Sequence, residues 1–65
     1  MGVKLHRILS AMKKQNIPDY AIYTRSGISK HDWMRVCAGK PVHIVVLAQI
    51  GKFLNLSLDE MYVFD

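Results

Sequence analysis

The sequence predicts an all-α fold, with five short helices packed as one compact domain over residues 1–65. Apolar residues recur every three or four positions along most of the 65-residue chain, which is the period of an amphipathic helix. Glycine and proline separate the periodic segments, and serine stands at the N-cap position of two of them. A chain of this length forms a single domain and buries only a modest core.

The first two helices are predicted over residues 3–15 and from Pro18 to Gly27. Proline suits the first turn of a helix, where its missing N–H has no intrahelical partner to lose. Asp19 places a negative charge at the positive end of the second helix, and Gly27 can adopt the left-handed conformation that ends it. One apolar stripe of the first helix has the spacing i, i+3, i+4, i+7, and its members are Leu5, Ile8, Leu9 and Met12.

The third helix has the clearest start signal of the chain. Ser29 is a favourable N-cap, and Asp32 follows three residues later, close to the pattern of a capping box. Ile28 and Trp33 occupy the N′ and N4 positions, where they can form a hydrophobic staple. Gly39 then predicts the end of this helix.

The fourth helix is predicted to follow Pro41 and to run to about Asn55. Residues 43–47 are rich in β-branched side chains and would also suit a strand. A helix is favoured because the helical period continues beyond them. Its inward face is predicted to consist of Ile44, Leu47, Ile50, Gly51 and Leu54.

The fifth helix repeats the start signal of the third. Ser57 is the N-cap and Glu60 the acidic partner of a full capping box, while Leu56 and Met61 have the spacing of a staple. Residues 62–65 either finish this helix or leave it.

The second and third helices, joined at Gly27, have the layout of a helix-turn-helix, a motif that presents its second helix to the DNA major groove. The charge distribution favours a polyanionic partner. Residues 1–40 contain eight Lys or Arg and two Asp, a net charge of +6, whereas residues 41–65 contain one Lys and three acidic residues, a net charge of −2. A solvated basic surface without a partner is the alternative interpretation.

Spaced apolar, glycine and serine residues extend this pattern from about residue 5 to residue 61. They are Ile17, Ile22, Gly27, Ile28, Ser29, Trp33, Val36, Gly39, Lys40, Ile44, Leu47, Ile50, Gly51 and residues 54–61. With these residues the chain resembles the lambda-repressor-like, Cro/CI-type helix-turn-helix family, also called the XRE family. The resemblance implies a sequence-specific transcriptional regulator of bacterial or phage type, most simply a repressor that blocks polymerase by occupying its operator.

Four features depart from that family pattern: two single residues, one pair of residues and one loop. Asp19 stands where the family often has a glutamine that touches a phosphate, and Tyr23 stands where an alanine packs under the recognition helix. Met12 and Cys37 occupy the places of a buried arginine–glutamate pair, so an inward-facing, inert thiol is expected at Cys37. The segment after Gly39 is also short, which predicts fewer phosphate contacts there.

The base-reading residues implied by the motif and the resemblance lie on the third helix. Lys30 and His31 are in its first turn, and Arg35 can donate a bidentate pair of hydrogen bonds to guanine. Met34 is a candidate contact for a thymine methyl group. The candidate phosphate contacts are Tyr20, Arg25, Ser29, Lys40 and the backbone around Val42 and His43. Each of these side chains would otherwise be an ordinary surface residue.

A second apolar stripe on the fourth helix, with the aromatic residues of the C-terminus, predicts a homodimer interface. Its members are Val42, Val45, Val46, Phe53, Tyr62 and Phe64. A symmetric dimer would place two recognition helices one turn of DNA apart and bind a palindromic operator. A wider core is the alternative explanation for this stripe.

Other classes of function find little support in the sequence. The only cysteine, Cys37, forms no internal disulfide, and His6, His31 and His43 lack the spacing of metal ligands. Neither a signal peptide nor an apolar run of about 20 residues is recognisable, so a cytoplasmic protein is expected. We expect no enzyme, cofactor, metal, membrane or small-molecule ligand. The rival hypothesis is a protein-interaction module on the same fold, such as an antirepressor or inhibitor.

Overall fold

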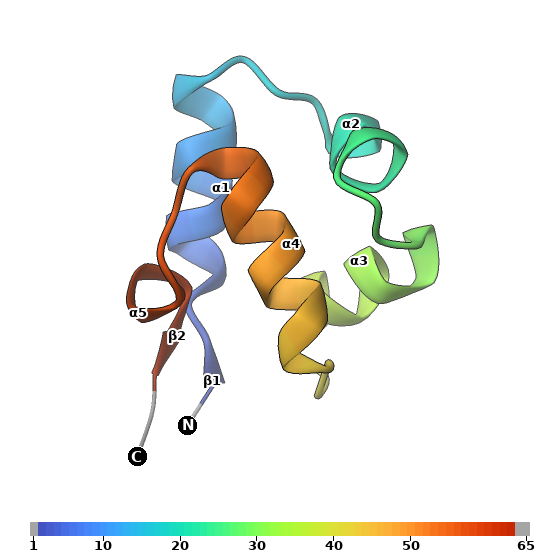
Figure 1. Cartoon of the computed structure of the whole chain (residues 1–65), viewed down its shortest axis with the longest axis vertical. Coiled ribbons are helices and arrows are strands. Elements are labelled where there is room, and N and C mark those ends of the chain that lie inside the picture. The colour runs from blue at the N-terminus through green and yellow to red at the C-terminus, as the bar shows by residue number, and fades with distance from the viewer. Residues whose placement is uncertain (1, 64–65) are drawn as a thin grey trace.

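The computed structural model describes residues 2–63, and within them it places five helices and two short strands (Figure 1). The prediction of a small, mostly helical domain with five helices is confirmed, and residues 43–47 are helical from Ile44 onward. The elements are β1 (Gly2–Val3), α1 (Leu5–Lys14), α2 (Asp19–Arg25), α3 (Lys30–Cys37), α4 (Ile44–Leu54), α5 (Leu58–Met61) and β2 (Tyr62–Val63).

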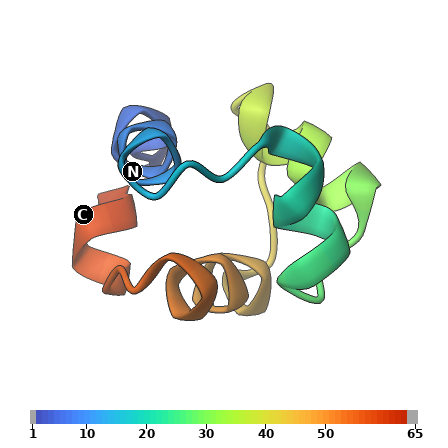
Figure 2. The same ribbon diagram turned by 90° about the horizontal axis from the view of Figure 1, so that it is seen from above.

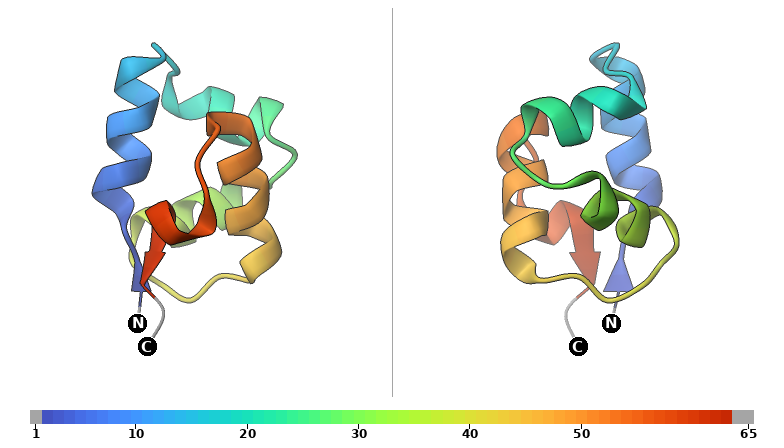
Figure 3. Two further views of the ribbon diagram at one scale, coloured as in Figure 1. Left: turned by 60° about the vertical axis from the view of Figure 1, so that its left-hand side comes forward. Right: turned by 90° about the vertical axis from the view of Figure 1, so that its right-hand side faces the viewer.

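The two strands correct the prediction of a purely α-helical fold. β1 and β2 pair antiparallel, with Gly2 opposite Val63 and Val3 opposite Tyr62. The Lys4 N–H extends this pairing by donating to the Met61 carbonyl oxygen at 2.6 Å. The chain therefore leaves α5 after Met61 instead of continuing the helix, and it lies beside the first residues of the described chain (Figures 1 and 3).

The core lies between α1, α4, α5 and the pair formed by α2 and α3, which surround it in Figure 2. Every helix contributes to it, because each places one apolar stripe inward. Burial of an aliphatic side chain stabilises the fold by about 1.5–3 kcal/mol relative to leaving it in water. The largest fully buried side chains are Ile8, Ile22, Val36, Leu47, Ile50, Leu54 and Met61.

Two members of the predicted apolar stripes lie outside the core. Leu9, on the stripe of α1, is 43% exposed. Ile44 is 48% exposed, although it continues the inward stripe of Leu47, Gly51 and Leu54 by sequence spacing. It is the first residue of α4, and this end of the helix projects at the edge of the molecule in Figure 1. Helical periodicity fixes the face of a residue but not whether another element covers that part of the face.

Gly51 lies where α4 comes close to residues 56 and 61. A Cβ atom at this position would lie 2.5 Å from the Leu56 carbonyl oxygen and 2.5 Å from Cε of Met61. The Leu56 N–H donates to the Gly51 carbonyl oxygen at 2.8 Å, which ties the end of α4 to the turn that follows. Asn55 makes this turn with a positive φ of 60°. The absence of a side chain at Gly51 thus permits α5 to fold back against α4.

Candidate nucleic-acid interface

Ser29 is the N-cap of α3. Its hydroxyl oxygen accepts a hydrogen bond from the Asp32 N–H at 3.1 Å, which satisfies a free donor of the first helical turn. Ile28 and Trp33, the predicted staple pair, are both buried, and Trp33 is only 4% exposed. This aromatic anchor fixes the side of α3 that faces the core. Lys30 and His31 consequently lie on the exposed side of the first turn.

α2 packs against α3, and residues 26–29 join them. Gly27 has a φ of 92°, a conformation that side-chain-bearing residues rarely adopt. The Ser26 hydroxyl donates to the Ile22 carbonyl oxygen and closes the end of α2, and it also accepts from the Ile28 N–H at 3.4 Å. Local hydrogen bonds of Ser26 and the positive φ of Gly27 therefore fix the path of the chain between the two helices.

Several candidate DNA contacts lie around one shallow hollow on α3. His31, Met34, Arg35, Ala38 and Lys40 line this hollow of about 180 Å³. Three of the four predicted base readers are thus brought together with one predicted phosphate contact. Met34 is 59% exposed, so its side chain is accessible for an apolar contact.

A second and wider hollow lies where α2 meets α3. It measures about 540 Å³, and Met34 and Lys30 take part in it. Met34 and Ala38 therefore line both hollows, and the lining of each is mainly apolar. Its lining residues are Asp19, Tyr23, Lys30, Trp33, Met34, Cys37 and Ala38.

Cys37 faces this wider hollow and not the core, which corrects the expectation of an inward thiol. Met12 is buried but Cys37 is exposed, so the two do not form the expected apolar pair. α3 turns Trp33 and Val36 inward, and the residue after Val36 points away from the core. Partial burial of the thiol, and then the negative charge of Asp19, raise the pKa of Cys37 above its usual 9.0.

Arg35 is not a freely extended side chain. It is half-buried, and its Nε and Nη2 both donate to the Pro41 carbonyl oxygen, at 3.1 and 2.6 Å. Sequence reasoning missed this contact because Pro41 lies beyond the end of α3. Arg35 thus lies on the expected helix, but one edge of its guanidinium is hydrogen-bonded to the Pro41 carbonyl oxygen.

The remaining phosphate candidates differ in how they are placed. Tyr20, Arg25 and Lys40 are exposed, whereas Val42 is half-buried against the core. The Nδ1 atom of His43 accepts from the Val45 N–H at 3.1 Å and caps α4. One of the free amides at the start of α4 is therefore already satisfied by a side chain of the protein.

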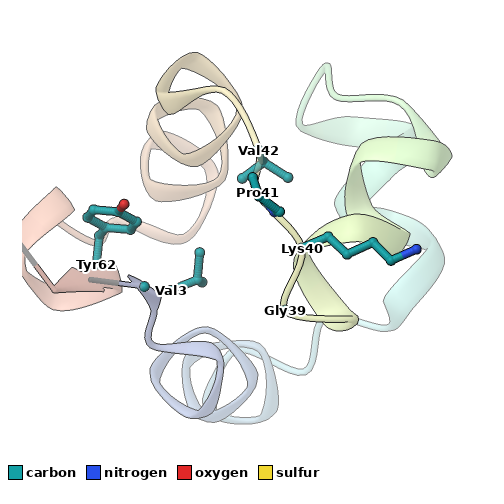
Figure 4. Close-up of a pocket in the computed structure, with 7 residues that line it drawn as sticks. Val3, Gly39, Lys40, Pro41, Val42 and Tyr62 are labelled. Carbon is teal, nitrogen blue, oxygen red and sulfur yellow. The ribbon is translucent and has the colours of Figure 1, made fainter.

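The loop between α3 and α4 also faces the paired strands. Gly2, Val3 and Tyr62 line a pocket of about 230 Å³ together with residues 39–42 of this loop. Figure 4 shows the side chains of Val3 and Val42 on either side of this space, while Lys40 extends away toward α3. The sequence did not predict that β1 lines this pocket, because a two-residue strand is too short to show periodicity.

Of the predicted dimer residues, three pack partly on the core. Val42, Val46 and Phe53 are half-buried there, as a wider core would require. Val45 is 52% exposed, and Tyr62 is half-buried within β2. Phe64 lies outside the described residues. A homodimer through this surface stays a prediction.

Within residues 2–63, no helix has the length and apolar character needed to cross a bilayer. The same residues contain no group of three His, Cys, Asp or Glu side chains placed to hold a metal ion. Comparison with models of known families, with curated proteins and with solved structures finds no match to this chain.

Proposed function

We propose that this protein is a sequence-specific DNA-binding transcriptional regulator, most simply a repressor, in which α2 and α3 act as a helix-turn-helix. The observation that carries the proposal is the presentation of α3. Trp33 anchors one side of the helix in the core, so Lys30 and His31 project from the other side at its positive end. The resemblance of the sequence to the Cro/CI-type family supports the same assignment.

In this proposal the first two turns of α3 enter the major groove. Lys30 and His31 donate to base edges, and Met34 contacts a thymine methyl group. Arg25 and Lys40 neutralise phosphates on either side of the groove, with Tyr20 and Ser29 as hydroxyl contacts. A homodimer would place two copies of α3 about 34–36 Å apart on a palindromic operator, and occupancy of that operator would block polymerase.

Fluorescence anisotropy with a labelled random-sequence duplex, at about 50 and 200 mM salt, tests this function. We expect measurable binding at the lower salt concentration and a steep loss at the higher one, because bound Lys and Arg release counterions from the duplex. Selection from a random DNA pool would then recover a palindromic site. Absence of binding at the lower salt concentration would contradict the proposal.

The wider hollow between α2 and α3 favours a second candidate, a protein-interaction module. Its lining is mainly apolar, and Tyr23 and Cys37 stand there at positions where the family pattern differs. An apolar helix of a partner protein would suit such a surface, as in helix-in-groove recognition. This candidate predicts no binding to random DNA at low salt, so the same titration separates the two functions.

A further inference from the structure

Arg35 contacts the loop after α3 with both its side chain and its main chain. The guanidinium donates twice to the Pro41 carbonyl oxygen, and the Arg35 carbonyl oxygen accepts from the Lys40 N–H at 2.9 Å. The Gly39 N–H donates in turn to the Val36 carbonyl oxygen at 3.2 Å, and Gly39 has a φ of 73°. These two backbone bonds form a Schellman motif, which reverses the chain direction at the end of a helix.

The side-chain contact extends this motif by one more residue. A Schellman motif alone fixes the chain as far as Lys40, whereas the guanidinium of Arg35 also fixes the Pro41 carbonyl group. The next residues are held from the other side, because Val42 packs against the core and His43 caps α4. The complete connection between α3 and α4 is thus bound to elements that flank it.

The same contact limits what Arg35 can do in a DNA groove. Bidentate recognition of guanine requires two N–H groups on one edge of a guanidinium that reaches into the groove. In this chain the Nε and Nη2 edge is bound to Pro41, and the side chain is half-buried, whereas Lys30, His31 and Met34 are exposed.

We propose that Arg35 is a positioning residue that orders the loop carrying Lys40, so that Lys40 and the start of α4 meet a DNA phosphate together. This inference rests on the proposed DNA-binding function, and it reassigns Arg35 from base reading to the placement of a phosphate contact. A planar guanidinium suits this role, because its N–H groups are held in a fixed geometry and little freedom is lost per hydrogen bond.

A double-mutant cycle with Arg35→Ala and Lys40→Ala tests the reassignment on random and selected duplexes. If Arg35 acts through the loop, its loss weakens binding to both duplexes by the same factor. Lys40→Ala then costs less in the Arg35→Ala background than in the wild-type protein, by at least about 2-fold. A loss confined to the selected duplex, or two losses that simply multiply, would overturn the proposal.

Amide hydrogen exchange without DNA tests whether the contact between Arg35 and Pro41 orders the loop. We expect Arg35→Ala and Arg35→Gln to accelerate exchange at the Gly39 and Lys40 amides, which are hydrogen-bonded in the structure. Met34→Ala is the matched control, because Met34 precedes Arg35 on α3 and its side chain makes no hydrogen bond to residues 39–41 of the described chain. Unchanged exchange at both amides in folded Arg35 variants would also overturn the proposal, whereas failure of the wild-type protein to bind DNA would instead refute the proposed function.

Discussion

Lys40 offers the clearest quantitative test of the proposed phosphate contacts. It lies on the loop between α3 and α4, its N–H is bonded to Arg35, and its exposed side chain extends toward α3 (Figure 4). Replacement by alanine removes one cation from this surface and leaves the backbone hydrogen bond in place. We therefore expect Lys40→Ala to weaken binding to all DNA sequences alike.

The size of the effect follows from counterion release. On a random duplex Lys30 has no cognate base to contact, so Arg25, Lys30 and Lys40 are the three exposed cations of one protomer that neutralise phosphates there. At about 0.9 per phosphate, they predict a slope of log affinity against log salt of about −2.7, which Lys40→Ala changes to about −1.8. Between about 50 and 200 mM salt, affinity should then fall about 40-fold in the wild-type protein and about 12-fold in the variant.

Anisotropy titrations of a random duplex at four or more salt concentrations would measure these slopes. Lys14→Ala is the matched control: it removes the same charge from the exposed last turn of α1, beside a separate hollow shared with Arg7, Leu54 and Glu60. Its slope should equal that of the wild-type protein. The reasoning is refuted if Lys40→Ala leaves the slope unchanged, or if both variants reduce it equally.

Three further predictions concern stability and the thiol. Gly51→Ala should lower the free energy of unfolding by about 1–3 kcal/mol in chemical denaturation, because its Cβ would meet the Leu56 carbonyl oxygen; a more stable variant would refute this packing. The Ser57 N–H and hydroxyl both donate to Glu60, and they hold the pKa of that carboxyl below its usual 4.5. A carboxyl group with a lowered pKa stabilises the fold above its unfolded pKa, and this stabilisation is lost as pH falls through its folded pKa. The difference in thermal midpoint between the wild-type and Glu60→Gln proteins should therefore disappear in acid. A difference that grows in acid would count against the capping box. Finally, Asp19→Asn should speed alkylation of the neighbouring thiol by iodoacetamide at pH 8, since it removes one cause of the raised pKa, and an unchanged or slower rate would contradict that electrostatic coupling.

Local signals in the sequence were sufficient to predict the helices. Ser29 and Ser57 form their capping hydrogen bonds with residues three positions further along the chain. The positive φ angles of Gly27 and Gly39 are properties of single residues. The burial of Trp33 also followed from spacing, because Trp33 forms the staple pair with Ile28 and shares one face of α3 with Val36. These predictions depend on contacts between near neighbours in the chain.

Features that depend on distant segments were not predictable in the same way. The pairing of β1 with β2 joins the two ends of the described chain, and neither strand is long enough to show a period of two. The hydrogen bonds from Arg35 to Pro41 depend on the path of the loop beyond Gly39. The exposure of Cys37 depends on the rotation of α3 against α2. For the same reason, the spacing of Ile44 predicted its face correctly but not the absence of a covering helix.

The central claim is that the exposed side of α3, with the loop that follows it, is the surface that meets DNA. A titration of ¹⁵N-labelled protein with a short duplex, followed by amide chemical shifts, tests this claim most directly. We expect the largest shifts at residues 29–35 and 40–45 and small ones on α1 and α5. Large shifts confined to α1, α5 or the paired strands, or no shifts at low salt, would contradict it.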